Sequence, residues 1–181
     1  MQAGDQVHMA RYILMRVAEE FGVNISFEPK LYPGWNGSGC HTNFSTKTMR
    51  SGEKGMKYIT DMLKKFELKH RLHIKLYGKG NQKRLTGHHE TSSVTKFTWG
   101  TGSRDTSFRI PSQTVADNGK GYIEDRRPAS NIDPYVVTAA LFDTGCLDFA
   151  QSKVESLASK YLDWSGLPAV DVDPADQRKR F

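Results

Sequence analysis

A short glycine-rich segment that ends in a histidine is the first part of this sequence whose residue types suit chemistry. Residues 36–41 read Asn-Gly-Ser-Gly-Cys-His. Glycines let a backbone approach a ligand closely, and an imidazole beside them could bind a metal ion. The segment is not a Walker A loop, because no Gly-Lys-Ser/Thr follows, and it does not have the Rossmann fingerprint. A histidine near glycines is more often structural than functional, so this segment alone assigns no function.

A set of arginines in strand-like or loop-like positions is the second feature. A guanidinium group donates in pairs to carboxylate or phosphate oxygens. Arg109 stands between two apolar residues, which suggests a charge that faces inward and needs an anionic partner. From the residues alone, structural salt bridges and anion binding both stay open. The set consists of Arg84, Arg104, Arg109, Arg126 and Arg127.

A carboxylate and an arginine two positions apart form the third feature. Alternation along a strand would place Glu124 and Arg126 on the same side. Such a pair could hold a divalent metal ion together with a phosphate, or it could be an ordinary surface ion pair. The run His88-His89-Glu90 could mimic a zinc site. Adjacent residues rarely share one metal ion, and no cysteine pair lies nearby, so zinc is disfavoured.

The helices that must position these residues are indicated by hydrophobic periodicity. Apolar residues at helical spacing predict a core-facing helix up to Phe21, with Asp5 as its cap and Gly22 at its end. A second helix is predicted over about residues 55–72, with Phe66 on its apolar face. A third begins at Asp133-Pro134, an aspartate cap followed by proline, and is expected to continue, broken at residue 145, toward residue 161.

The remaining periodic segments are predicted to be strands. They comprise residues 23–27, 73–77, 94–99 and 107–110, and a strand around Glu124 that follows a turn. The order of elements is mixed, which indicates an α+β protein, and the short connections favour antiparallel strands.

Composition limits the classes of protein. The 181 residues fit one domain, and 37% of them are hydrophobic. The longest apolar runs are too short to span a bilayer, and we expect no signal peptide. Cys40 and Cys146 are too few for a disulfide framework. We therefore expect free thiols and a cytoplasmic location.

The charge is basic, with a net value of +6 and a pI of about 9.3. Nucleic acid, a membrane surface and phosphorylated small molecules are the acidic partners that such a balance suggests. Residues 47–84 hold twelve Lys or Arg and three acids. A nucleic-acid-binding face would interleave aromatic residues with these charges, but Phe66 falls on the apolar stripe. A solvated helix face is the favoured interpretation, with neither nucleic acid nor membrane as a partner.

Four segments, in order, resemble the eukaryotic-type glutamine synthetase family. Residues 35–46 are similar to its ATP-binding signature, and residues 84–92 resemble its flap. Residues 104–111 resemble its phosphate-binding strand, and residues 121–135 its closing metal-ligand motif. Together the match covers roughly residues 4–145. The third feature, the arginines and the glycine-rich segment all lie inside these motifs.

The resemblance implies a fold and an extent. The expected fold is the carboxy-terminal portion of the family's catalytic domain, α+β, an antiparallel sheet with flanking helices. Residues 1–148 are then a partial catalytic domain, and residues 149–181 a divergent carboxy-terminal helix and tail. Family subunits also carry an amino-terminal β-grasp domain and further metal-binding glutamates, neither of which is expected in this sequence.

The resemblance also implies roles for matched residues. His41 and Glu124 match two ligands of one divalent ion, Mg²⁺ or Mn²⁺, that bridges the nucleotide phosphates. Glu90 matches a flap glutamate that helps to deprotonate ammonium. The residues matched to ATP binding are His41, Asn43, Ser45, Arg104 and Arg109. Those matched to substrate binding are Asn36, Gly37, His41, Arg84 and Arg126, and those matched to catalysis are Glu90, Arg84, Arg104 and Arg126.

The implied activity is ATP-dependent ligation of ammonia to the side chain of L-glutamate through γ-glutamyl phosphate, giving L-glutamine, ADP and phosphate. Expected partners are glutamate, ammonium, ATP and other subunits, which in the family form homo-oligomeric stacked rings. The alternative is a truncated, inactive fragment that binds nucleotide or other subunits. Because further ligands are expected elsewhere, we expect the isolated chain to make little or no glutamine.

Overall fold

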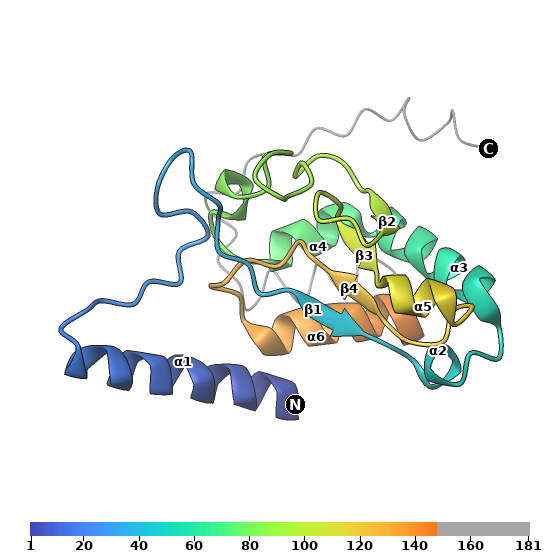
Figure 1. Ribbon diagram of the computed structural model, residues 1–181, viewed down its shortest axis with the longest axis horizontal. Coiled ribbons are helices and arrows are strands. Elements are labelled where there is room, and N and C mark those ends of the chain that lie inside the picture. The colour runs from blue at the N-terminus through green and yellow to red at the C-terminus, as the bar shows by residue number, and fades with distance from the viewer. Residues whose placement is uncertain (148–181) are drawn as a thin grey trace.

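A layer of helices covers one face of a small sheet and leaves the other face open (Figure 1). The structure is a computed structural model that describes residues 1–147. Its helices are α1 (Gln2–Glu20), α2 (Lys47–Ser51), α3 (Gly55–Leu68), α4 (His70–Leu76), α5 (Ser112–Ala116) and α6 (Pro134–Phe142). A 3₁₀ turn, η1, spans Asn81–Lys83, and a π-helical turn, η2, spans Asp143–Leu147. The strands are β1 (Thr42–Phe44), β2 (Trp99–Thr101), β3 (Phe108–Ile110) and β4 (Ile123–Asp125).

Within the described residues, the strands form one mixed sheet in the order β1-β4-β3-β2. β4 pairs antiparallel with β1 and with β3, whereas β2 and β3 run parallel. The α+β prediction is confirmed, but the expectation of antiparallel pairing is wrong for β2 and β3. Parallel strands usually need a long crossover. Here each strand is three residues long, so the loop that starts at Gly102, with a φ of 66°, suffices to carry the chain back.

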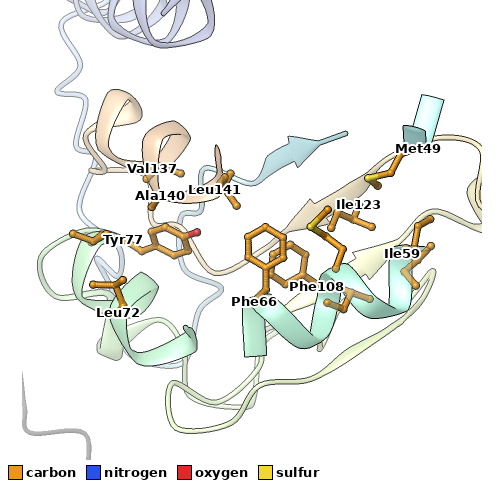
Figure 2. Packing of buried hydrophobic residues seen from close by; sticks show 14 of the residues in the cluster. Met49, Ile59, Phe66, Leu72, Tyr77, Phe108, Ile123, Val137, Ala140 and Leu141 are labelled. Atoms are coloured by element: carbon orange, nitrogen blue, oxygen red, sulfur yellow. The ribbon is translucent and has the colours of Figure 1, made fainter. Parts of the chain in front are cut away.

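The core lies between the sheet and helices α3, α4 and α6 (Figure 2). Phe66 of α3 and Phe108 of β3 are fully buried, and their ring centroids lie 4.8 Å apart. The prediction that Phe66 belongs to the apolar face of its helix is therefore confirmed. Other buried members of this core are Ile59, Leu63, Ile110, Ile123, Val137 and Leu141.

Strand alternation separates core residues from site residues. Phe108 and Ile110 are buried on the helix side, so Arg109 between them lies on the opposite face, where it is only partly buried. Asn43 and Arg109 each pair in register with Glu124, which places these three residues in one row across the open face. The prediction that Arg109 faces inward is thus wrong, since only its two neighbours on the strand face the core.

Helix α1 differs most from its sequence expectation. Its predicted core-facing residues Ile13, Val17 and Phe21 are about half exposed or more, at 52%, 47% and 74%. α1 contacts α6, and the Arg11 guanidinium donates to the carbonyl of Ser130 at 2.6 Å. Asp5 lies in the first turn, and Met1 occupies the cap position. The apolar face of α1 therefore packs little against the rest of the described chain.

Two predicted strands are absent from residues 1–147. Residues 23–27 have no regular structure. Residues 73–77 belong to α4 and its end. The strand prediction failed here because almost every side chain is buried, and a fully buried short segment satisfies helix and strand patterns alike. The predicted helix at 55–72 divides at Lys69 into α3 and α4, and the strand predicted at 94–99 begins only at Trp99.

The start of α6 follows its prediction. The Asp133 side chain accepts hydrogen bonds from the backbone amides of Tyr135 and Val136, at 2.8 and 3.2 Å, and Pro134 occupies the first turn. The chain continues as η2 through Gly145, and the continuation predicted toward residue 161 lies outside the described residues. In the described part, no helix has the length and apolar character needed to cross a membrane. Cys40 and Cys146 are both free thiols.

Candidate active site

The glycine-rich segment reaches the open face of the sheet because the segment that follows β4 holds it in place. The Cys40 amide donates to the Pro128 carbonyl at 3.0 Å, and the Ser130 amide donates to the Ser38 carbonyl at 3.0 Å. Gly39 and Ala129 form an isolated antiparallel bridge. These contacts extend the β1–β4 pairing and bring His41, which directly precedes β1, next to Glu124 of β4.

The glycines of this segment make room for an arginine. A Cβ atom added at Gly37 would lie 2.6 Å from Arg84 Cγ, and one added at Gly39 would lie 2.5 Å from Arg84 Nη2. Real Cβ contacts are not this short, so a larger residue at either position would displace part of the Arg84 side chain, and at Gly39 it would displace the guanidinium. The sequence suggested that this backbone approaches a ligand closely. In the structure, the group that it approaches is the side chain of Arg84.

His41 and Glu124 lie in contact at the centre of the site. His41 Nδ1 is 3.1 Å from Glu124 Oε1, and the Glu124 side chain is 7% exposed. The second oxygen, Oε2, is buried without a hydrogen bond, although Arg109 Nε lies within 2.5 Å of it. We infer that this arginine neutralises the carboxylate without saturating it. A buried carboxylate with an imidazole beside one of its oxygens suits a hard divalent cation.

His41 is neutral at neutral pH. Burial, followed by the charges of Arg126 and Arg84, lowers its pKa to about 4, and Glu124 opposes this shift only in part. Arg84 Nη2 faces His41 Nε2 at 3.1 Å. A guanidinium only donates, and guanidinium groups face both ring nitrogens, since Arg126 Nη1 lies 3.4 Å from Nδ1. The closer Glu124 Oε1, which can only accept, assigns the imidazole proton to Nδ1. A neutral imidazole is the form that ligates metal ions.

Arg84 is a buried arginine whose donors are largely used by backbone. Its Nη2 donates to the Arg126 carbonyl at 2.9 Å and its Nη1 to the Arg127 carbonyl at 3.2 Å. Burial, followed by the charge of Arg126, lowers its pKa to about 10, so the group stays charged at neutral pH. Arg84 therefore brings a fixed positive charge to His41.

Arg126 links the strand side of the site to the flap. Its Nε and Nη2 donate to the Arg104 carbonyl at 3.1 and 2.9 Å, and Nη2 also donates to the Glu90 carbonyl at 3.3 Å. Its Nη1 lies 3.4 Å from Glu124 Oε1. The predicted placement of Glu124 and Arg126 on one side of the chain is confirmed, and both are buried.

The flap segment places Glu90 at the rim of this arrangement. His89 and Glu90 both adopt left-handed backbone, with φ of 55° and 60°, which costs on the order of 1 kcal/mol or more for each. Glu90 Oε1 pairs with Arg104 Nη1 at 3.3 Å, and both side chains are more than half exposed. Strained backbone of this kind clusters at switch regions and ligand clamps.

The chain matches the family model "Glutamine synthetase, catalytic domain" over residues 1–156. The chain belongs to the glutamine synthetase family. Among curated relatives, it is 55% identical over 145 residues to the glutamine synthetase of Neurospora crassa, covering 80% of this chain and 40% of the relative. It is 60% identical over 144 residues to that of Candida glabrata, covering 79% and 38%.

A relative from a plant matches over a similar length. The chain is 52% identical over 145 residues to a protein named glutamine synthetase cytosolic isozyme 1-1 from Oryza sativa, covering 80% of this chain and 40% of the relative. It thus spans about two fifths of the length of such glutamine synthetases. A solved structure titled "Apo GmaS without ligand" superposes with a TM-score of 0.60 at 24% identity, covering 84% of this chain and 35% of that one. This likeness concerns the fold alone.

The structure gathers most, but not all, of the residues that the glutamine synthetase resemblance singled out. His41, Glu124, Arg84, Arg109 and Arg126 converge on the open face, and Glu90 and Arg104 lie at its rim.

The other residues matched by the resemblance lie outside this convergence. Gly37 lies against Arg84. Asn43 shares the row of Glu124 but points to solvent, and Asn36 is exposed. The Ser45 hydroxyl instead accepts from Arg50 Nη1 at 2.9 Å.

Arg127 belongs to a different set from the other arginines. It is 1% exposed, and it donates to both oxygens of Asp125 at 2.9 and 2.8 Å on the core side of the sheet. Its guanidinium also lies over the ring of Phe108. The signal was present in the sequence, since Asp125 and Arg127 share the strand parity of the core residue Ile123.

The described residues contain few ligands for a metal ion. Residues 1–147 hold no group of three or more His, Cys, Asp or Glu side chains suited to one ion. His41 and Glu124 are a two-ligand set, and the Glu124 carboxylate, which Arg109 already pairs at Oε2, would fit a single hard divalent ion together with the neutral imidazole of His41.

Proposed function

We propose that this chain contributes one part of the active site of an ATP-dependent glutamate–ammonia ligase. The reaction joins ammonia to the side-chain carboxylate of L-glutamate through γ-glutamyl phosphate and releases L-glutamine, ADP and phosphate. One observation carries the proposal. The partly exposed His41 and the buried Glu124 lie in contact and are surrounded by guanidinium groups on the open face of a sheet, in a member of the glutamine synthetase family.

The charge of the site supports a polyanionic substrate. Arg84, Arg104, Arg109 and Arg126 outnumber the carboxylates Glu90 and Glu124, while His41 is neutral. Phosphoryl transfer is catalysed mainly by positioning and by neutralising charge on oxygens. A surplus of positive charge, part of it buried and part of it exposed at the rim, would bind the phosphates of ATP and the carboxylate of glutamate.

His41 and Glu124 would hold one Mg²⁺ or Mn²⁺ ion. When bound, such an ion neutralises and orients phosphate oxygens. Arg109, which already lies against Glu124 Oε2, would then turn toward the ATP phosphates, together with the exposed Arg104. Asn36, Gly37, Asn43 and Ser45 are proposed to line the substrate and nucleotide positions next to these groups.

Arg84 and Arg126 have different roles in this proposal. Arg84 is fixed by backbone carbonyls, so it would act as a stationary positive charge beside glutamate. Arg126 bridges Glu124 and the flap, so it would stabilise the phosphoryl group in transfer. Glu90 lies at the exposed rim, where a carboxylate could take a proton from ammonium while the flap keeps water from the acyl phosphate.

Only part of the site is proposed to reside in this chain. We propose that residues 1–148 are a partial catalytic domain and residues 149–181 a divergent tail. We further propose that the remaining metal ligands come from the part of the family's length that this chain does not span, and that function involves other subunits in a homo-oligomer. A cytosolic location completes the proposal, and neither nucleic acid nor membrane is a proposed partner.

A second function is favoured by the ligand count. Because the described residues offer only two ligands for one ion, the chain by itself could bind a metal–nucleotide complex without turnover. Two measurements distinguish the candidates. Mn²⁺ binding in the presence of ADP tests the site, and glutamine formation by the pure chain tests catalysis. We expect binding with little or no glutamine. Glutamine formation by the pure chain at rates like those of complete synthetases would refute the second function, which is binding without turnover.

The binding experiment compares two histidines. His41→Ala should weaken ADP-dependent Mn²⁺ binding by about tenfold or more, since one of two ligands is lost. His8→Ala is the control, because His8 stacks on Tyr135 between α1 and α6, away from the site. Paramagnetic resonance of Mn²⁺ reports the free ion directly. Equal apparent affinities for wild type and His41→Ala would remove His41 from the metal site.

A further inference from the structure

A buried asparagine outside the matched motifs lies beside Arg84. Asn81 opens the 3₁₀ turn η1, is 1% exposed and stands three residues before Arg84. Its Nδ2 donates to the Arg127 carbonyl at 2.7 Å, and its Oδ1 accepts from Arg84 Nη1 at 3.4 Å. Its backbone carbonyl accepts from the Arg84 amide at 3.0 Å. Asn81 therefore contacts Arg84 at both ends of the arginine.

The chemistry of these contacts requires an amide. The Arg127 carbonyl can only accept, so the group that faces it must donate. The Arg84 guanidinium can only donate, so the group that faces it must accept. Asparagine supplies both in one short side chain, and only one orientation of its amide satisfies both partners. Aspartate would keep the acceptor and lose the donor, and alanine would lose both.

We propose that Asn81 is a positioning residue that fixes the Arg84 guanidinium against His41. Arg84 Nη1 and Asn81 Nδ2 share the Arg127 carbonyl, so the amide closes a ring of contacts around Nη1. This restraint leaves Nη2 directed at His41 Nε2, 3.1 Å away, and at the Arg126 carbonyl, 2.9 Å away. Because Asn81 is 1% exposed and contacts Arg84, its effect on the site would pass through Arg84.

The Arg127 carbonyl is itself a firm anchor. The Arg127 side chain is buried against Asp125, with both carboxylate oxygens bound, and its amide donates to Asp125 Oδ1 at 3.1 Å. Arg127 Nη1 faces His70 Nδ1 at 2.9 Å. Since the backbone at this position is held on the core side, the carbonyl that Asn81 and Arg84 share cannot follow a displaced guanidinium. Arg84 would instead gain rotational freedom.

The experiment measures the rotation of the Arg84 guanidinium in the full chain. Nitrogen line shapes of isotope-labelled arginine report rotation about the Cζ–Nη bonds, and Arg84→Lys identifies the Arg84 signals. In Asn81→Ala we expect rotation to become about tenfold faster, the factor that corresponds to losing one hydrogen bond to a charged group. In Asn81→Asp, which keeps the acceptor, we expect slow rotation to persist even though stability falls.

Asn131→Ala is the matched control. The Asn131 side chain also donates to a backbone carbonyl, that of Lys79 at 2.9 Å, and ties the same two segments together without contacting Arg84. Slow Arg84 rotation in Asn131→Ala and fast rotation in Asn81→Ala would support the proposal. Slow rotation in Asn81→Ala would overturn it, and so would equally fast rotation in both variants, which would show loop tethering alone. Asn81→Ser gives the same comparison should the alanine variant not fold.

A second readout connects this inference to the proposed function, on which the role of Arg84 in glutamate binding rests. Asn81→Ala should weaken binding of L-glutamate by about tenfold, and Asn131→Ala should leave it unchanged. If the wild-type chain bound neither L-glutamate nor Mn²⁺ with ADP, the proposed function of this chain would fail. The rotation of Arg84 would still decide the role of Asn81, because it is measured without ligand.

Discussion

Arg127 and Asp125 form a two-pronged ion pair directly behind the strand that carries Glu124. Both hydrogen bonds are short, 2.9 and 2.8 Å, and both side chains are at most 1% exposed. Tyr77 donates to the same carboxylate at 2.8 Å. The pair stands on the core face of β4, while Glu124 stands on the open face. One strand thus carries a structural carboxylate and a candidate metal ligand on opposite sides.

Removing one member of this pair should be costly. Arg127→Ala leaves the Asp125 charge buried and uncompensated, so we expect a loss of about 3–5 kcal/mol in the free energy of unfolding. The double variant Asp125→Asn with Arg127→Met removes both charges and should lose less. Urea unfolding measures both, with Lys64→Ala on the exposed face of α3 as the control. A loss under about 1 kcal/mol in Arg127→Ala would contradict the buried-pair account.

Stability should depend on pH through the buried histidines. Burial, followed by the charge of Arg127, lowers the pKa of His70 from 6.5 to about 4, and the same causes lower that of His73. The unfolded chain therefore takes up protons first as the pH falls. Stability is fully present above about pH 6.5 and is lost progressively toward about pH 4, by up to about 3 kcal/mol for His70.

The test of this pH dependence is a set of urea unfolding curves at about pH 7.5 and about pH 5. His70 Nε2 donates to the Val94 carbonyl and Nδ1 faces Arg127, so His70→Gln keeps polar contacts and removes the titration. This variant should lose less stability between the two pH values than wild type. An identical loss in wild type and His70→Gln would show that other groups cause the pH dependence.

The glycine at position 39 should be required for the site rather than for the turn. An added Cβ would lie 2.5 Å from Arg84 Nη2 and 2.9 Å from His41 Nε2. Gly39→Ala should therefore weaken Mn²⁺–ADP binding about tenfold or more and destabilise the chain by about 1–3 kcal/mol through overpacking. Ser38→Ala, at the adjacent exposed position, is the control. Full binding by Gly39→Ala would mean that Arg84 relocates without consequence.

Arg126 should not tolerate lysine. Its Nε and Nη2 both donate to the Arg104 carbonyl, while Nη1 faces Glu124. The single ammonium group of a lysine cannot make these contacts together. In a complete synthetase that contains this segment, Arg126→Lys should reduce turnover by about 10² or more, nearly as far as Arg126→Ala. Steady-state kinetics measure this. Near-normal turnover by the lysine variant would contradict the proposed role of Arg126.

Local signals were sufficient for several features. The Asp133-Pro134 cap predicted the start of α6 because capping depends only on neighbouring residues. The spacing of Glu124 and Arg126 predicted their common side, since strand alternation is also local. Four motifs in order indicated the family. The cap and the strand pair depend on residues at most a few positions apart, and the motifs depend on their order along the chain, both of which a sequence shows directly.

Other features were decided only by contacts between distant segments. Residues 73–77 alternate like a strand, yet they form helix α4, because burial on all sides removes the periodicity that distinguishes the two structures. The face of α1 was predicted to pack in the core, yet it is exposed in the described structure. An amphipathic pattern shows which face of a helix is apolar, but it does not show which segment packs against that face.

The division of the arginines shows the same limit. Sequence left salt bridges and anion binding open for all five. In the structure, Arg127 pairs with Asp125 on the core side. Arg84 and Arg126 contact His41, from which they are 43 and 85 positions away in the sequence. The sequence alone determined which residue types were present and that Glu124 and Arg126 would share one side of the chain, but it suggested the wrong side for Arg109. Only the tertiary structure decided which charges meet, because the free energy of a buried charge depends on partners that chain folding brings from distant positions.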